Sequence, residues 1–474
     1  MAFEPSVGFT TARIAAHHTT LAKSTFLNQI SHQERCSSHL RASTSSSSGQ
    51  GIITASLASY LNTVVKHKSR CTLAASAASP DTEASPSANL TGSQKTFDLV
   101  ALSNLCVDIV VQTSELPPAD DSSRRQLLTN LTANPPDVSS WEVGGNTNTL
   151  IAASRLGLRV ASIGHIGNDI YGKFLTDVLK DEGIKLIEPV TANLDSSSSS
   201  IITNINGLTK EQDATLLCFV LVAPNSQHSF CSRYDFGPWP LLSFVETLPP
   251  GVERVLDSTA ALFVNGFVFD EVPSHIVIAA AQRAQQGGAA VFFDPGPRSW
   301  TFNDNGARKA ALNAILDVSD VVLMTEEEAE AVTGYGNAEA AARFILDRPG
   351  ARTEWCIVKR GAEGAVLVSR SPGNGVYEQR ALKVDVRDTV GCGDSFAAAV
   401  VLGYTRQHSI PAVMALASAV GAATAMGSGA GRNVAKAEAV ASLLKSAVSN
   451  CEDGRHFTAL ELLQQSLLAS QDEE

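Results

Sequence analysis

The 474-residue chain lacks the features that mark membrane-spanning, disulfide-bonded and zinc-binding proteins. No apolar run approaches the roughly 20 residues that a membrane-spanning helix needs, so we expect a soluble protein. The eight cysteines include no C-x-x-C pair and no Cys/His group with zinc spacing. In a chain of this length, scattered thiols are typical of a reducing compartment and not of a disulfide framework.

Outside the N-terminal part of the chain, Lys and Arg are outnumbered by Asp and Glu. The net charge is −12, whereas residues 1–80 contain seven Lys or Arg and two Asp or Glu, a balance of +5. The remaining residues must therefore carry −17, because −12 minus +5 is −17. Such an acidic body argues against a nucleic-acid partner that is held by charge.

Acidic residues are rare in residues 1–90, which are rich in Ser, Thr and Ala and include an unbroken serine run at 45–48. This composition is typical of an organellar transit peptide, and no apolar core follows the N-terminus closely enough for a secretory signal. The excess of Ser and Thr over Arg favours the plastid (chloroplast) over the mitochondrion. The alternative is a plain disordered tail on a protein that stays in the cytosol.

From Phe97 onward, strand-like and helical segments alternate, which favours a parallel sheet covered on both faces. Strands are expected at 97–111, 160–163, 261–269, 289–293, 318–324, 355–358 and 365–368, and helices at 149–156, 171–182, 274–286, 326–332, 395–404 and 412–425. Residues 215–222 and 228–234 form two strands without an intervening helix, so a small β element is expected to project from the sheet. We predict one α/β domain over residues 97–446 and a helical tail over 447–474.

The segment Asp388-Thr-Val-Gly-Cys-Gly-Asp394 places two glycines directly before an Ala-rich helix. Glycine lets the backbone approach a ligand closely, and N–H groups at a helix N-terminus favour phosphate. We therefore expect an anion hole at the N–H groups of Gly391, Cys392 and Gly393. Asp394, beside it, is suited to accept the proton of an attacking hydroxyl. Taken alone, an ordinary Asp cap after a glycine loop explains the segment equally well.

Two further glycine-bearing segments precede it, at 141–148 (Trp-Glu-Val-Gly-Gly-Asn-Thr-Asn) and at 164–172. In order and spacing, over roughly residues 97–440, the three segments resemble the two signature regions of the ribokinase (PfkB) family of sugar and nucleoside kinases. The resemblance implies a three-layer α/β/α ribokinase-like fold with a small β-sheet lid. It also implies ATP as the phosphoryl donor, Mg²⁺ as the required ion and, through the lid, a homodimer.

The resemblance implies a role for each residue that matches the family pattern. The catalytic base is Asp394, with Gly391, Cys392 and Gly393 as the anion hole. Contacts with the substrate are implied for Asp108, Gly144, Gly145 and Asn148. Contacts with ATP are implied for Lys359, Gly361, Gly364, Gly429 and Ala430. A carboxylate can accept hydrogen bonds from two vicinal hydroxyls, so Asp108 suits a polyol, whereas the alternative is a strand-end Asp that makes a turn.

The resemblance also implies two ion sites. Glu328 and Thr325 would hold Mg²⁺ through water, and Thr325 stands where the family commonly has Asn, which offers more contacts than a hydroxyl. Asp388 and Thr389 lie where the family often places a monovalent cation such as K⁺. Gly296 and Ser103 are further departures, standing where the family usually has Asn and Gly, and the glycine pair lies one residue nearer Asn148.

Cys392 occupies a position where the family usually has Ala. A thiol at a helix N-terminus can have a lowered pKa and become oxidisable, which predicts redox-sensitive activity. The alternative is a small residue that simply fits the space.

These motifs and the family resemblance are compatible with two functions. The first is an ATP-dependent phosphotransferase that acts on a hydroxymethyl group of a sugar or nucleoside. The second is a catalytically weak or inactive fructokinase-like protein with a regulatory or scaffold role in plastids. The acceptor stays open among fructose, ribose, a nucleoside and an inositol. The expected lid contains four aromatic residues, Phe230, Tyr234, Phe236 and Trp239. They would either stack against a nucleoside base or form the core of the lid.

Overall fold

The computed structural model describes residues 95–102, 104–117, 120–188, 214–224, 228–232, 246–303, 306–371, 373–448 and 454–471. The expected leader, Ser103 and three of the lid aromatics (Tyr234, Phe236 and Trp239) lie outside these residues. None of the helices in the described part of the chain is both long and apolar enough to cross a bilayer.

Within these residues, nine strands form one large sheet in the order β13-β12-β11-β10-β9-β8-β1-β4-β5. They are β1 (Leu99–Leu102), β4 (Val160–Ile163), β5 (Lys185–Ile187), β8 (Ala261–Asn265), β9 (Ala290–Asp294), β10 (Val321–Thr325), β11 (Trp355–Lys359), β12 (Ala365–Ser369) and β13 (Val376–Gln379). Neighbours from β11 to β5 are parallel, whereas β12 and β13 add an antiparallel edge. The expected parallel sheet is confirmed over its central strands.

Alternate side chains of each central strand enter different core layers. In β10, Val321 and Leu323 pack into one layer, and Val322 and Met324 pack into the other. Because side chains alternate across a strand, a parallel strand buried on both faces is a continuous apolar run. The run at 321–324 therefore specifies a central strand and a sheet with two covered faces.

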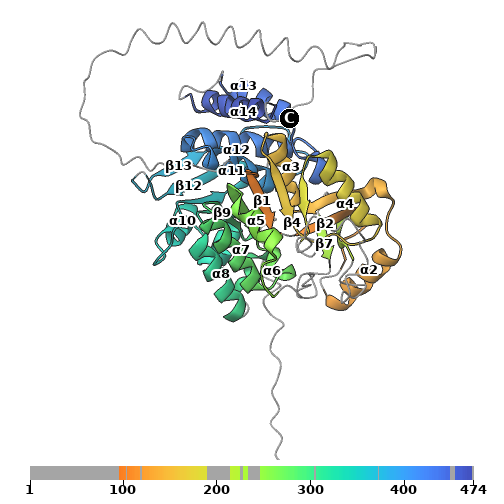
Figure 1. Ribbon diagram of the computed structural model, residues 1–474. Coiled ribbons are helices and arrows are strands. Elements are labelled where there is room, and N and C mark those ends of the chain that lie inside the picture. Colours follow the sequence, from red (N-terminus) through yellow and green to blue (C-terminus); the bar gives the residue numbers. More distant parts are fainter. Residues whose placement is uncertain are drawn as a thin grey trace, which may run out of the picture. The chain divides into compact units, whose positions relative to one another are not determined.

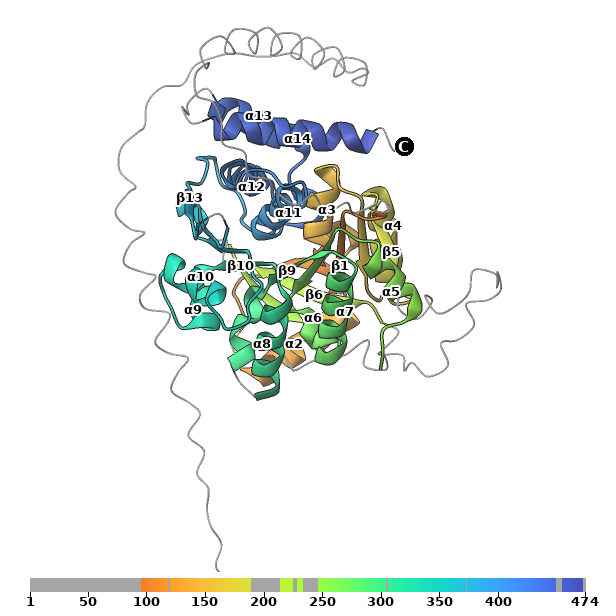
Figure 2. The ribbon, with the colours of Figure 1, turned by 60° about the vertical axis from the view of Figure 1, so that its left-hand side comes forward.

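Helices cover both faces of the sheet, which gives three layers (Figures 1 and 2). The first core layer contains residues of α3 (Thr147–Arg155), α4 (Ile170–Asp181), α11 (Cys392–Thr405), α12 (Ile410–Ala425), α13 (Ala437–Val448) and α14 (Arg455–Gln471). The second contains residues of α5 (Pro250–Asp257), α6 (Val268–Glu271), α7 (Ser274–Gln286), α8 (Gly306–Val318), α9 (Glu326–Thr333) and α10 (Ala338–Leu346). The expected α/β/α architecture is confirmed.

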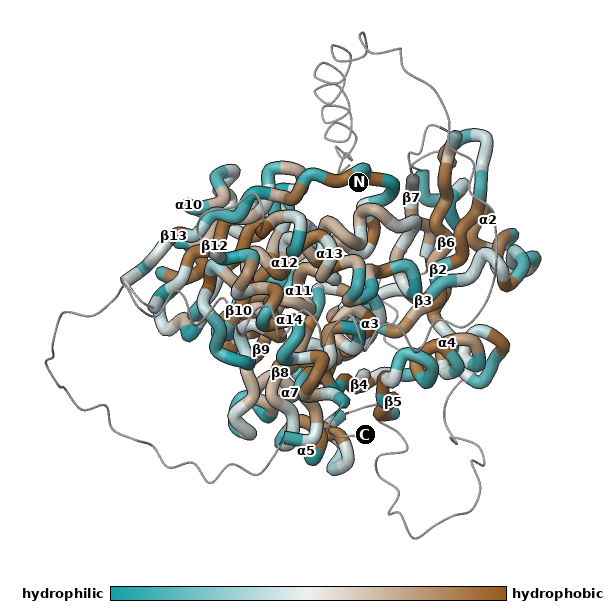
Figure 3. Tube along the Cα trace, turned by 90° about the horizontal axis from the view of Figure 1, so that it is seen from above, coloured by the Kyte–Doolittle hydropathy of each residue, from teal (hydrophilic) through white to brown (hydrophobic). Residues whose placement is uncertain are grey.

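A second, four-stranded sheet has the order β3-β2-β6-β7. Its strands are β2 (Leu105–Gln112), β3 (Trp141–Gly145), β6 (Leu216–Val222) and β7 (His228–Ser232), and they correspond to the small β element expected from the sequence. In Figure 3, β2 and β6 are largely brown, whereas α4 alternates between brown and teal as an amphipathic helix does.

The chain crosses from the large sheet to the small one at Asn104, which has a φ of 60°. Asn tolerates this left-handed conformation better than most residues do. The Asn104 N–H donates to the buried Glu271 carboxylate at 2.9 Å, and its carbonyl accepts from the Asn146 N–H at 3.1 Å. These bonds fix where β2 begins and therefore where Asp108 lies.

Three strand predictions need correction. The strand expected at 97–111 is two strands, because the chain changes sheets at Asn104. The strand expected at 261–269 ends at Asn265, since a Cβ on Gly266 would lie 2.0 Å from the Pro295 carbonyl and the chain turns there into α6. Val318 belongs to α8 and not to β10.

Helix α2 (Asp121–Ala133) was not predicted, because it buries no residue and so carries no apolar period.

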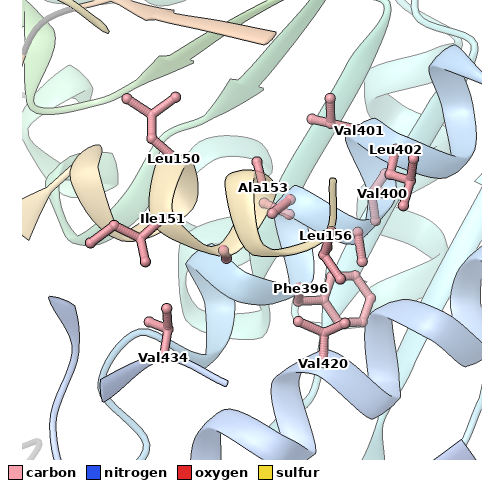
Figure 4. Packing of buried hydrophobic residues seen from close by; sticks show 14 of the residues in the cluster. Leu150, Ile151, Ala153, Leu156, Phe396, Val400, Val401, Leu402, Val420 and Val434 are labelled. Atoms are coloured by element: carbon pink, nitrogen blue, oxygen red, sulfur yellow. The ribbon is translucent and has the colours of Figure 1, made fainter. Parts of the chain in front are cut away.

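The packing of α3 on α11 supports the segments that carry the expected site (Figure 4). Leu150 of α3 is fully buried beside the apolar residues of α11. We expect Leu150→Ala to lower the free energy of unfolding by about 3 kcal/mol, because it removes buried methyl groups and leaves a cavity. Leu468→Ala is the matched control, since Leu468 is 56% exposed and its loss should cost less than about 0.5 kcal/mol. Urea unfolding measures both, and equal losses would contradict this packing.

Candidate active site

The carboxyl ends of the central strands bring three charged or polar side chains to one edge of the sheet. Asp294 ends β9, Thr325 ends β10 and Lys359 ends β11, and Thr325 pairs with Lys359 in the parallel register. In open α/β sheets this edge is where ligands bind. The site therefore begins at the strand ends and is completed by the loops and helices that follow.

Helix α11 begins near this edge, and among the described residues two N–H groups at its start have no acceptor. Gly391 precedes the helix with a φ of 79°, a conformation that favours glycine, and a Cβ there would lie 3.1 Å from the Ala430 Cβ. The Gly391 and Gly393 N–H groups have no acceptor among the described residues, whereas the Cys392 N–H donates to the Thr389 carbonyl at 3.3 Å. Two of the three predicted donors are thus open to an anion.

Two neighbouring side chains of the β3–α3 segment hold the Asp394 carboxylate. Asn148 Nδ2 donates to Asp394 Oδ2 at 3.1 Å, and the Thr149 hydroxyl donates to Oδ1 at 3.4 Å. Burial and the nearby charge of Asp294 raise the pKa of Asp394 to about 6, against the lowering effects of Lys359 and of these two donors. A carboxylate with this pKa is deprotonated at neutral pH and basic enough to take a proton.

Asn148 was predicted to bind substrate, and this role stays a prediction. The structure brings its amide within hydrogen-bond distance of Asp394, the expected base. Its Oδ1 also accepts from the Gly431 N–H at 2.8 Å, so both ends of the amide contact the protein. Thr149 was not predicted at all, because it reads in the sequence as an ordinary residue at the start of a helix.

Asp108 lies on β2 against the backbone of Gly144. A Cβ on Gly144 would lie 2.3 Å from Asp108 Oδ1, so only glycine leaves room for this carboxylate. Burial raises the pKa of Asp108 to about 7, the Cys106 thiol lowers it by donating to Oδ1 at 3.6 Å, and the charges of Asp394 and Glu142 raise it. Asp108 and Asp394 thus lie within electrostatic reach, although 286 positions separate them in the sequence (394 minus 108).

The second glycine of the pair, Gly145, is needed for a different reason. It has a φ of 62°, and a Cβ there would lie 2.2 Å from the Asn104 carbonyl. The pair therefore gives the Asp108 carboxylate its space and closes the junction between the two sheets.

Lys359 forms a buried ion pair with Asp294, with 2.7 Å between Nζ and Oδ2. Burial opposes its positive charge, but the carboxylates of Asp294, Glu328 and Asp394 outweigh this effect and raise the pKa of Lys359. Its Nζ lies 3.5 Å from where a Cβ on Gly393 would be, beside the anion hole. The structure therefore places this predicted nucleotide residue near the expected position of the transferred phosphate.

Thr325 and Glu328 form a capping box at the start of α9. The Glu328 N–H donates to Thr325 Oγ1 at 3.3 Å, and the Thr325 N–H donates to Glu328 Oε2 at 2.7 Å. Burial and the charge of Asp294 raise the pKa of Glu328 to about 7. Among the described residues no group of three or more His, Cys, Asp or Glu could hold a metal ion. Mg²⁺ commonly uses one or two carboxylates plus phosphate and water, so Glu328 fits an ion held through water.

The Asp388 carboxylate connects two loops by hydrogen bonds. Its Oδ1 accepts from the Val390 N–H at 2.9 Å, and its Oδ2 accepts from the Gly429 N–H at 2.8 Å, whereas Thr389 is exposed. The loop before the anion hole is thereby joined to the 429–433 turn. A monovalent cation at Asp388 and Thr389 stays a prediction.

The remaining predicted nucleotide residues lie in two turns. Gly361 and Gly364 have φ values of 54° and 97° in the β11–β12 connection, and a Cβ on Gly364 would lie 1.9 Å from the Gln379 carbonyl. Gly429 has a φ of 79° and precedes the buried Ala430, which packs under Gly391. Each of these glycines has a conformational reason to be there, and their contacts with ATP stay predictions.

The expectation of a lowered thiol pKa at Cys392 is wrong. Burial and the charges of Asp388 and Asp394 raise the pKa of this thiol to about 12. The helix N-terminus is outweighed by desolvation and two carboxylates, so little thiolate is present at neutral pH. The interpretation of Cys392 as a small residue that fits is therefore preferred.

Open N–H groups at a helix start, the neighbouring Asp394 carboxylate and a second carboxylate, Asp108, within electrostatic reach of it are the parts expected of a phosphotransferase site at the edge of an α/β/α sheet. The comparisons agree with this class. The model of the pfkB family of carbohydrate kinases matches residues 129–437, more than half of the chain. The chain belongs to this family and is an ATP-dependent carbohydrate kinase.

Several matching proteins are distant in sequence. The 5-dehydro-2-deoxygluconokinase of Bacillus anthracis is 23% identical over 331 residues, which cover 68% of this chain and 87% of the relative. Two solved structures with 19% identity share the fold, and each match covers 74% of this chain and 99% of the other. They are a ribokinase of Arabidopsis thaliana complexed with ribose and ATP (TM-score 0.54) and a fructokinase of Xylella fastidiosa with bound ATP (TM-score 0.53).

The pKa of Asp394 predicts how the activity depends on pH. Asp394, as the expected base, must be deprotonated to accept a proton, so kcat/KM should fall as the pH falls through about 6. Asp294→Asn removes a negative charge near Asp394 and releases the Lys359 ammonium from its ion pair. Both changes lower the pKa of Asp394, so the fall in kcat/KM should occur at lower pH. Thr149→Val removes a hydrogen-bond donor to the Asp394 carboxylate, so the fall in kcat/KM should occur at higher pH.

The matched control is Asp317→Asn, which removes a half-exposed carboxylate that pairs with Arg348 on the outer side of the fold. The kcat/KM of this variant should fall over the same pH range as that of the parent. Shifts of Asp294→Asn and Thr149→Val in the same direction would contradict the assigned electrostatics.

Proposed function

We propose that the protein transfers the γ-phosphoryl group of ATP to a hydroxymethyl group of a sugar or nucleoside. The observation that carries the proposal is the Asp394 carboxylate, half-buried in the first turn of α11 beside two open N–H groups and within electrostatic reach of Asp108. This arrangement supplies a base, an anion hole and a hydroxyl-binding carboxylate in one place.

Each residue has a task in this proposal. Asp108 accepts hydrogen bonds from acceptor hydroxyls, and Asp394 takes the proton of the attacking hydroxyl. The N–H groups of Gly391 and Gly393, with the Lys359 ammonium beside them, stabilise the negative charge on the transferred group. Mg²⁺, when bound, neutralises phosphate charge, and Glu328 would hold it through water with the Thr325 hydroxyl nearby. A ribokinase II of E. coli has been solved with ATP and Mg²⁺ and shares the fold (TM-score 0.54).

Asp394→Asn tests the base directly. The amide keeps the shape and can still accept hydrogen bonds, but it cannot take the proton, so turnover should fall by at least about 100-fold. Thermal unfolding and binding of an ATP analogue should change little. A variant that keeps parental turnover would refute the assignment of the base.

The acceptor is found by a coupled assay with fructose, ribose, adenosine, myo-inositol and 5-dehydro-2-deoxygluconate. Turnover of fructose, ribose, adenosine or 5-dehydro-2-deoxygluconate by the parent, lost in Asp394→Asn, supports the proposal. Turnover of myo-inositol alone, which has ring hydroxyls but no hydroxymethyl group, would contradict the hydroxymethyl acceptor. Binding of ATP without turnover of any acceptor would favour the alternative, a fructokinase-like regulatory or scaffold protein. The aromatic shelf for a nucleoside base stays a prediction, and of its four residues only Phe230, which is 43% exposed, lies in the described part.

We propose that residues 1–90 direct the protein to the plastid, because they are basic, rich in Ser and Thr and poor in acids. A fluorescent protein fused after residue 90 should be imported and shortened by chloroplasts in an import assay. A fusion in which the seven Lys and Arg of residues 1–80 are replaced by Gln is the control and should be imported less. An unprocessed protein outside the organelle would refute this location. A K⁺ site at Asp388 and Thr389 and a homodimer through the small sheet stay predictions from the family resemblance.

A further inference from the structure

The 429–433 turn is held against the small sheet by an ion pair. Arg432 Nε lies 2.6 Å from Glu142 Oε1, and Arg432 also donates to the Trp141 carbonyl at 3.3 Å. Asn433 Nδ2 donates to the other Glu142 oxygen at 3.4 Å. One carboxylate of β3 therefore binds two consecutive residues of the turn.

Close backbone contacts reinforce this ion pair. Gly431 has a φ of 62°, a Cβ there would lie 2.5 Å from Glu142 Cγ, and its N–H donates to Asn148 Oδ1. Only glycine allows the turn to approach β3 this closely. The turn therefore packs closely against β3 and is hydrogen-bonded to the beginning of α3.

The other side of the turn contacts the anion-hole loop. The Gly429 N–H donates to Asp388 Oδ2, and Ala430 packs against Gly391. The turn therefore connects the loop expected to bind phosphate with the strand that carries the glycine pair.

Glu142 is also adjacent to the acceptor side. It pairs with Asp108 in the antiparallel register of β2 and β3, so the two side chains lie on the same face of the small sheet. Arg432 lies with its guanidinium 5.3 Å from the ring centre of Phe174, whose ring packs edge-on against Trp141. An exposed ion pair alone contributes little, but this one is braced by a carbonyl group and an aromatic ring.

We propose that the Arg432–Glu142 pair couples the two halves of the active site, so that binding of the nucleotide to the loops at 388–394 and 429–433 orders the acceptor strand at 141–148. The proposal rests on the proposed function, since it takes the nucleotide to bind at these loops. Arg432 and Glu142 are positioning residues, because they touch the segments that bind substrates and not the reacting atoms.

Amide hydrogen exchange tests the coupling without knowledge of the acceptor. Saturating AMP-PNP with Mg²⁺ should slow exchange in 388–394 and in 141–148 of the parent by about 5-fold or more. In Arg432→Gln and in Glu142→Gln, each at saturating AMP-PNP, the slowing should persist in 388–394 but fall below about 2-fold in 141–148. Arg432→Lys keeps the charge and should retain most of the effect.

Arg343→Gln is the matched control, because Arg343 forms a similar exposed pair with Glu339 on α10 and should behave as the parent does. Undiminished slowing in 141–148 of Arg432→Gln would overturn the coupling. So would a parent in which AMP-PNP protects 388–394 alone, and that result leaves the proposed function intact. Protection of neither segment in the parent would refute both proposals.

Discussion

The active site depends on how the Asp394 carboxylate is held at the start of α11. Its two oxygens accept from Asn148 and Thr149, which lie 246 and 245 positions earlier in the chain. The same carboxylate has its pKa raised by burial and Asp294 and lowered by Lys359 and these donors. The balance leaves a carboxylate that is charged at neutral pH yet more basic than an exposed one, as proton abstraction from a hydroxyl requires.

The fold supplies this balance because elements that are distant in sequence end at one edge. The parallel register brings Asp294, Thr325 and Lys359 to the carboxyl ends of neighbouring strands, and α3 packs on α11 so that Asn148 and Thr149 reach Asp394. The small sheet then brings Asp108 and Glu142 toward the same charges. A carboxylate-rich site of this kind is stabilised by cations, here Lys359 and, in the proposed reaction, Mg²⁺.

The sequence predicts those parts that local patterns determine. The apolar run at 321–324 indicates a buried strand, and the glycines before Ser395 indicate an anion-binding helix start. The contacts of Thr149, Asp294 and Glu142 could not be predicted, because each depends on a tertiary partner that no local pattern encodes. The pKa of Cys392 was mispredicted for the same reason, since the helix terminus is visible in the sequence but the burial and the two carboxylates are not. Helix α2 carries no apolar period and was missed.

Burial and Asp294 give the Asp394 carboxylate the raised pKa that a base needs. The most direct measurement is an NMR titration of the Asp394 side-chain carboxyl carbon in ¹³C-Asp-labelled protein, with the signal assigned by its absence in Asp394→Asn. We expect a midpoint near pH 6. A midpoint near 4, the value of an unperturbed aspartate, would contradict it.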